Sequence, residues 1–105
     1  MIMGKNAKIL ENELKKKENL CVLFYATWCP FSMEFLPVFK EYEKTKPTEC
    51  MRVIVDDEEE LCDKYSIEYY PTVILFKKGK VYKRLDAEPG VGLSRTQLKE
   101  LTKDP

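Results

Sequence analysis

The sequence predicts an α/β domain in which helices cover both faces of a mixed sheet. Segments with helical spacing of apolar residues alternate with short apolar runs, and strands that alternate with helices form a parallel sheet. The runs at 20–25 and 51–55 are almost wholly apolar, which is typical of strands buried on both faces. The last two runs, 72–76 and 81–85, flank a short turn with a glycine, which predicts an antiparallel hairpin at the sheet edge.

The first half of the chain is expected to contain two helices around one strand. Residues 5–18 place Ile9, Leu10 and Leu14 on one helical face. A strand follows at 20–25, and then a second helix at 31–44. The predicted apolar face of that helix consists of Met33, Phe35, Leu36, Phe39 and Tyr42, with Pro37 as a kink and with Phe24, Phe35 and Phe39 in the core.

The second half begins with a strand at 51–55 and a helix at 56–65. The helix is acidic at its start and ends near Lys64, which suits the helix dipole. We expect the acidic run at 56–60 to be a solvated helix start rather than a cation site, because such a start already suits the dipole.

The C-terminal part is expected to contain the hairpin and a last helix. The hairpin strands turn at residues 77–80, and the chain breaks at 88–90, where proline and glycine occur together. Ser94 should cap the last helix, with Gln97 three residues later completing a capping box.

Length and composition indicate one ordered globular domain spanning residues 1–105. Lys+Arg and Asp+Glu both number 18, so the electrostatic case for nucleic acid or an anionic membrane as the main partner is removed. No apolar run approaches the roughly 20 residues that span a bilayer, and the N-terminus is too polar for a signal peptide. We therefore expect a cytoplasmic protein, or one of an oxidising compartment if the chain is a domain cut from a secreted parent.

The cysteine at position 29 is the candidate nucleophile, and we expect its sulfur to be exposed and partly ionised. The chain has no histidine, which excludes Ser-His-Asp and Cys-His catalysis. The spacing of its four cysteines matches no zinc pattern, so neither a metal nor another cofactor is expected. Cys29 lies between a buried strand and a helix start, where unpaired N–H groups and the helix dipole favour a thiolate. Pro30 suits the first helical position, because its missing N–H costs nothing there.

The segment FYATWCPFSMEF at residues 24–35 resembles the active-site segment of the thioredoxin superfamily, which usually reads W-C-x-x-C. Three further features at matching spacings are Pro37, a helix-kinking proline; Tyr70-Pro71-Thr72, similar to the segment whose cis-proline faces the cysteine; and Gly79, the hairpin glycine. The resemblance implies the thioredoxin fold, with a central mixed four- to five-stranded sheet flanked by helices on both faces. The N-terminus looks short for the family's first strand, so we expect that strand to be absent or reduced.

The sequence departs from the family pattern at three positions. Ser32 replaces the second, resolving cysteine, and Leu23 stands where family members carry a buried Asp or Glu. Arg52 stands where thioredoxins pair a Lys with that acid. In the family the acid is thought to take a proton during attack by the second cysteine. Losing both groups together is consistent, since a buried acid without that role would only cost desolvation.

The resemblance and these departures together predict a monothiol thiol–disulfide oxidoreductase or isomerase. Cys29 can attack a disulfide and form a mixed disulfide, but the Ser32 hydroxyl cannot release the partner by forming S–S. Release would come from an external thiol such as glutathione, or from another thiol of the substrate. The expected partners of this chain, taken as a monomer, are therefore protein thiols, protein disulfides or glutathione. Ser32 is also expected to donate a hydrogen bond to the Cys29 thiolate.

A substrate-binding surface around the sulfur follows by analogy with the family. Its residues are Trp28, Pro30, Phe31, Tyr70 and Pro71, with Trp28 at the rim, and exposed aromatics would suit an extended polypeptide that pairs with the Tyr70 backbone. A redox-inactive binding or chaperone module that keeps the fold is the alternative function. An iron–sulfur carrier of the monothiol glutaredoxin type ranks last, and Cys29 as a buried structural thiol also stays open.

The other three cysteines, Cys21, Cys50 and Cys62, are predicted core residues. By the family's strand register, Cys21 and Cys50 lie on adjacent parallel strands and point to the same face. A disulfide between them stays open, although its strict geometry makes such bonds rare and a Cα separation beyond about 7 Å would rule it out.

Overall fold

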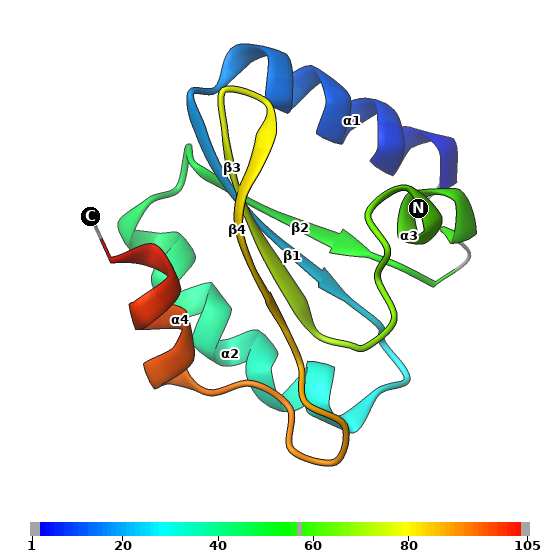
Figure 1. The fold of residues 1–105 in the computed structure, drawn as a ribbon, viewed down its shortest axis with the longest axis vertical. Coiled ribbons are helices and arrows are strands. Elements are labelled where there is room, and N and C mark those ends of the chain that lie inside the picture. The colour runs from blue at the N-terminus through cyan, green and yellow to red at the C-terminus, as the bar shows by residue number, and fades with distance from the viewer. Residues whose placement is uncertain (1–2, 57, 104–105) are drawn as a thin grey trace.

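A computed structural model describes residues 3–56 and 58–103, and in this part of the chain one sheet runs through the centre (Figure 1). Its four strands have the order β2 (Cys50–Ile54), β1 (Asn19–Tyr25), β3 (Thr72–Lys77) and β4 (Lys80–Asp86). β1 pairs with β2 in parallel, whereas β3 is antiparallel to both β1 and β4. The mixed sheet confirms the predicted fold class, and its four strands are the lower of the two strand numbers predicted. In the described residues no strand precedes the first helix.

Helices cover both faces of the sheet, as predicted. α1 (Met3–Lys16) and α3 (Glu59–Lys64) lie on one face, and α2 (Pro30–Thr45) and α4 (Arg95–Thr102) lie on the other (Figure 1). Successive residues of a strand point to opposite faces, so the central strand β1 contributes to a core on each side. None of the described helices is long and apolar enough to cross a membrane.

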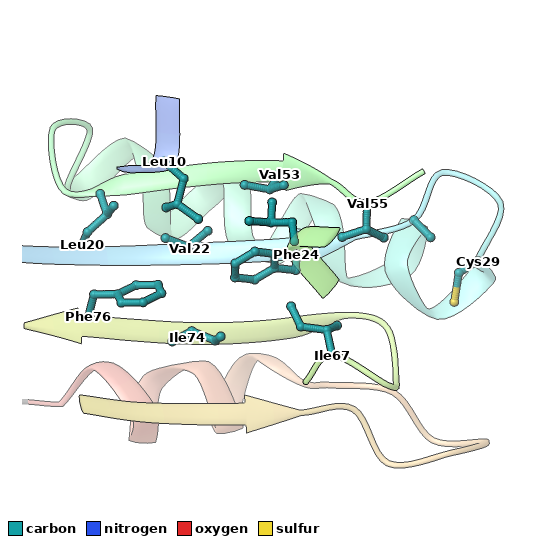
Figure 2. Close-up of a cluster of buried hydrophobic side chains, with 12 residues drawn as sticks. Leu10, Leu20, Val22, Phe24, Cys29, Val53, Val55, Ile67, Ile74 and Phe76 are labelled. Carbon is teal, nitrogen blue, oxygen red and sulfur yellow. The ribbon is translucent and has the colours of Figure 1, made fainter. Parts of the chain in front are cut away.

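Two apolar cores hold the helices on the sheet. The core below α1 and α3 contains Val22, Phe24, Ile74 and Phe76 of the sheet with Leu10 and Leu61 of the helices. The core below α2 and α4 contains Leu23, Val73, Phe35, Phe39, Leu98 and Leu101. The predicted core residues Phe24, Phe35 and Phe39 are each at most 1% exposed. In Figure 2, Cys29 stands at the end of the first core, beyond the end of β1.

The predicted apolar face of α2 was wrong at one position. Phe35 and Phe39 are buried, and Leu36 and Tyr42 are partly buried, but Met33 is 38% exposed. At about 100° per residue, Ser32 lies on the same side of the helix as Phe35 and Phe39, and Met33 turns away from it. The buried position in the first turn therefore belongs to a polar residue.

The acidic run differs from its prediction as well. α3 begins only at Glu59, and Glu58 is 5% exposed instead of solvated. The Glu58 N–H donates to the Val55 carbonyl at 2.9 Å, which folds this residue back against the end of the sheet. Within the described residues its Oε2 has no hydrogen-bond partner.

The local signals near the C-terminus are confirmed. Lys78 and Gly79 both have positive φ, 52° and 81°, as a two-residue hairpin turn that matches the strand twist requires. Ser94 caps α4 and accepts a hydrogen bond from the Gln97 N–H at 3.2 Å, while the Gln97 side chain accepts from the Ser94 N–H at 2.9 Å.

Cys21 and Cys50 are register partners in the parallel pair of β1 and β2. Neighbouring strands lie about 4.8 Å apart, which is within the Cα limit for a disulfide, and both thiols are free in this structure. Cys21 is 2% exposed and lies in the core below α2 and α4, and Cys50 is partly buried and packs against that core. The contact with the Cys50 thiol, and then burial, raise the pKa of Cys21.

We expect the free energy of unfolding to fall above about pH 9, with Cys21 contributing to the fall. The unfolded chain releases the Cys21 proton around its ordinary pKa of 9.0, whereas the folded chain keeps it. The stabilisation is therefore complete below pH 9 and is lost as the pH rises, by at most about 1.4 kcal/mol per pH unit for one proton. Urea unfolding measured between about pH 8 and about pH 10 should show that the free energy of unfolding falls less steeply with pH in Cys21→Ala than in the wild type.

Val22, the buried residue that follows Cys21 in β1, provides the control variant. Val22→Ala shortens another fully buried side chain of β1 without removing a titrating group, so it should lower stability at every pH and keep the wild-type slope. A Cys21→Ala slope equal to that of the wild type would contradict the assignment.

Candidate active site

Cys29 lies at the start of α2, four residues after the end of β1. Its backbone is extended, with φ −96° and ψ 119°, and it is the residue before the first helical position, which Pro30 occupies. The Cys29 carbonyl accepts the Met33 N–H at 3.0 Å, which begins the helical pattern. The side chain thus stands at the positive end of the dipole of a 16-residue helix.

A loop with a cis-proline faces this cysteine. The Tyr70–Pro71 peptide bond is cis, as the resemblance implied, and the Cys29 thiol donates to the Tyr70 carbonyl with Sγ and O 3.7 Å apart. Thr72 Oγ1 donates to the Tyr69 carbonyl at 2.7 Å, and the Ala87 N–H donates to the Pro71 carbonyl at 3.1 Å. The fold therefore brings together two predicted site segments that lie 41 positions apart.

The expectation of an openly exposed sulfur was wrong. Cys29 is 8% exposed and belongs to the core below α1 and α3. The facing proline loop and the packing of that core cover most of the side chain. What remains open is a hollow of about 240 Å³, lined by Cys29 and by Trp28, Phe31, Glu68, Tyr69, Tyr70, Ala87, Glu88, Pro89 and Gly90. A partner that reacts with the thiol must enter through this hollow.

Aromatic side chains form much of its rim. Trp28 is 67% exposed, and its ring meets that of Tyr70 edge-on, with centroids 5.7 Å apart. Phe31 is partly buried and rests on Gly92, where an added Cβ would lie 3.0 Å from Phe31 Cδ1 and where φ is 84°. Of the other predicted binding residues, Pro30 is exposed, whereas Pro71 is buried and shapes the site through its backbone.

Ser32 does not act on the sulfur as predicted. Its side chain is fully buried, and its Oγ accepts a hydrogen bond from the Ala26 N–H at 3.2 Å. Within the described residues there is no hydrogen bond between Ser32 and Cys29. Ser32 instead ties the first turn of α2 to the chain that leaves β1, so its role in this structure is to position the segment that carries Cys29.

A second contact, which was not predicted from the sequence, also positions this segment. Asp56 accepts hydrogen bonds from the Thr27 N–H, at 3.1 Å, and from the Thr27 hydroxyl. Asp56 had been grouped with the solvated acidic run. The strand pairing contains the signal, because Tyr25 and Ile54 are register partners at the ends of parallel strands, and Thr27 and Asp56 each follow two residues later.

A second thiol lies near the site from the side of α3. Cys62 Sγ is 3.8 Å from the hydroxyl of Tyr70, and Cys62 is partly buried and packs against the core below α1 and α3. Burial, and then the contact with Cys62, raise the pKa of Tyr70 to about 12, while burial raises the pKa of Cys62. Both groups therefore stay protonated and neutral near pH 7.

The ion pair that the resemblance implied has no counterpart in the part of the chain described here, because Leu23 stands in place of the acid. Leu23 and Arg52 are register partners, but Leu23 is fully buried in the core below α2 and α4. The Arg52 side chain is exposed and donates to Glu43, with Nε and Oε2 3.2 Å apart. Among the described residues, no group of three or more His, Cys, Asp or Glu side chains could hold a metal ion.

Comparison with known sequences finds one family across the chain. Residues 2–101 match the family model described as Thioredoxin. A thioredoxin of Mycoplasmoides gallisepticum is 33% identical over 100 residues, covering 93% of this chain and 95% of that protein. Mouse protein disulfide-isomerase A5 is 28% identical over 81 residues, covering 71% of this chain. The chain matches only 16% of the length of that isomerase, and 62% of thioredoxin-1 of Caenorhabditis elegans, which is 38% identical over 71 residues.

Solved structures give the same result. A cysteine-to-serine mutant of the Entamoeba histolytica thioredoxin is 30% identical with a TM-score of 0.79, covering 92% of this chain and 91% of that one. A reduced thioredoxin pre-protein of Schistosoma mansoni is 31% identical with a TM-score of 0.76, covering 95% and 89%. Mitochondrial thioredoxin 3 of Saccharomyces cerevisiae, 23% identical with a TM-score of 0.79 and coverage of 94% and 90%, shares the fold.

We expect Ser32→Ala to lower the free energy of unfolding by about 1–3 kcal/mol, because the Ala26 N–H would lose its partner in a buried place. Urea unfolding at neutral pH measures the loss. Thr48→Ala, at an exposed position between α2 and β2, is the matched control and should change stability by less than about 0.5 kcal/mol. Equal stability of the two variants would show that the hydroxyl of Ser32 does not carry the contact.

Proposed function

Because the chain belongs to the thioredoxin family, we propose that it exchanges disulfides with protein partners through Cys29 alone. The arrangement that carries this proposal is a cysteine at a helix start, 3.7 Å from the carbonyl that precedes a cis-proline, at the base of an aromatic-rimmed hollow. Aligned N–H groups at a helix start stabilise a thiolate, and the thiolate is the form that attacks a disulfide.

The exchange forms one S–S bond for each one that breaks. The Cys29 thiolate attacks one sulfur of the partner disulfide, a bond forms between Cys29 and that sulfur, and the other partner sulfur leaves and takes up a proton. A resolving cysteine would end this state from within the chain, but Ser32 presents a buried hydroxyl that cannot form S–S. The mixed disulfide therefore persists until a second thiol attacks it, which is a free thiol such as glutathione or another thiol of the partner.

The remaining cysteines are poorly placed to resolve it. Cys21 lies near the start of the seven-residue β1, so that most of the strand, at about 3.3 Å per residue, separates it from the Cys29 end. Its register partner Cys50 lies at the same far end. Cys62 contacts the Tyr70 hydroxyl rather than Cys29, and burial disfavours its thiolate by raising its pKa.

A binding module without redox activity is the second candidate. The low exposure of Cys29, 8%, favours it, as does the exposure of the neighbouring aromatics, 67% for Trp28 and 48% for Tyr69. In this case the aromatic rim would hold a polypeptide and the thiol would be a packed core residue.

Incubation with an uncharged peptide disulfide separates the two candidates. We expect intact-mass analysis of the wild type to show one stable peptide adduct, which peptide mapping assigns to Cys29, and Cys29→Ala to show none. Ser32→Cys should form the adduct and then lose it, because the introduced thiol displaces the peptide and closes an intramolecular disulfide.

Partner binding by Cys29→Ala tests the second candidate, the binding module. If this variant retains partners as strongly as the wild type, and the wild type forms no adduct at Cys29, the binding module is correct and exchange is not. If the adduct forms on the wild type but Ser32→Cys retains it, the monothiol account of its persistence is wrong.

A further inference from the structure

We propose that the Cys29 hollow selects cationic disulfide partners over anionic ones, so that a peptide rich in Lys or Arg reacts faster than a glutathione-like disulfide. This inference rests on the proposed exchange at Cys29 and names the class of partner. The inference follows from the charged residues that line the hollow. The aromatic rim alone would not favour a partner of one charge over a partner of the other.

Two glutamates from different loops are among the residues that line the hollow. Glu68 comes from the loop before the cis-proline, and Glu88 from the loop after β4, and both residues are exposed. Among the residues that the structure describes, no lysine or arginine lines the hollow. In the described part of the chain neither glutamate forms an ion pair. Exposed carboxylates are charged at neutral pH, so the entrance to Cys29 is negative.

Hydrogen bonds hold both loops in place. The Glu88 carbonyl accepts from the N–H groups of Val91 and Gly92, each at 2.9 Å, and Gly92 in turn packs on Phe31. On the other side, the Arg84 guanidinium donates to the Tyr65 carbonyl at 2.6 Å and to the Ser66 carbonyl at 3.3 Å, just before Glu68. The two charges are therefore presented from anchored backbone, at the place where a partner enters.

The negative entrance is a local property, because the formal net charge of the whole chain is zero. Lysines gather elsewhere, around a second hollow of about 980 Å³ between the end of α1 and the β3–β4 turn. Its lining includes Lys15, Lys16, Lys17, Lys64 and Lys78, together with Glu11 and Glu18. The α1 end and the turn lie beside the start of β1, whereas Cys29 follows its end (Figure 1). Charge is thus separated along the sheet.

This separation affects which partner approaches the sulfur. A glutathionyl group has two carboxylates and one ammonium, so it carries net negative charge toward a negative entrance. A cationic peptide is attracted, and surface charges of this kind raise association rates by about tenfold or more at low ionic strength. The screening length is about 10 Å at 0.1 M salt and about 30 Å at 0.01 M, so the preference should decrease as salt is added.

Three matched peptide disulfides test the preference. The peptides share one framework, differ only in charged residues that make them cationic, neutral or anionic, and carry the same leaving thiol. Rates of adduct formation at Cys29 are measured by intact mass and divided by the rates of a small uncharged thiol, which removes the intrinsic reactivity of each peptide. We expect the cationic peptide to react about tenfold faster than the anionic one at about 0.02 M salt, and about twofold faster at about 0.5 M.

Charge-removing variants locate the cause. Glu68→Gln with Glu88→Gln should reduce the cationic-to-anionic ratio at low salt by about threefold or more. Glu18→Gln removes one exposed carboxylate beside the second hollow, at the opposite end of β1, and should leave the ratio unchanged. A glutathione disulfide should react like the anionic peptide.

The outcomes separate this inference from the proposed function. Equal normalised rates for the three peptides, or a ratio that the double variant retains, would overturn the charge preference while disulfide exchange at Cys29 stands. An absence of any Cys29 adduct with all three peptides would instead overturn the exchange itself.

Discussion

Parallel pairing of β1 with β2 is the constraint on which the site depends. Because the two strands run in the same direction, their carboxyl ends leave the sheet at one edge, where Tyr25 is paired with Ile54 and the Val55 N–H donates to the Tyr25 carbonyl at 2.8 Å. The residues that follow the two strands therefore lie close together, and Thr27 donates hydrogen bonds to Asp56. That contact fixes the turn from which Cys29 and α2 begin.

Burial of β1 on both faces supplies the stability for this arrangement. Leu23 packs with Phe35 and Phe39 below α2, and all three are at most 1% exposed. A carboxyl group at position 23 would have been desolvated among these side chains at a large free-energy cost. Leu23 is therefore part of the packing that holds α2 against the sheet.

The element order could be predicted because its signals are local: continuous apolar runs for the strands, a two-residue turn at Lys78 and Gly79, and a Ser94 cap. What could not be predicted depends on contacts between distant residues. Asp56 was missed because its partner Thr27 lies 29 positions away. The low exposure of Cys29 was missed because a loop 41 positions later covers it.

Helical spacing also predicted the wrong buried residue in the first turn of α2. The apolar face of α2 was drawn through Met33 because methionine is apolar, yet the buried position in that turn is Ser32. A hydroxyl can occupy it because the Ala26 N–H, at the end of β1, needs an acceptor. A pattern of residue types along one helix cannot reveal a backbone donor on a neighbouring segment.

The enclosure of Ser32 keeps its hydroxyl away from the surface on which a partner would bind. Whatever docks on the aromatic rim touches no atom of this side chain, so an oxygen or a sulfur at that position presents the same outer face. Under the proposed exchange, a change at position 32 would therefore alter the lifetime of the mixed disulfide without altering the surface that a partner contacts. One enclosed atom would set how long a partner is held, while the exposed residues would set which partner binds.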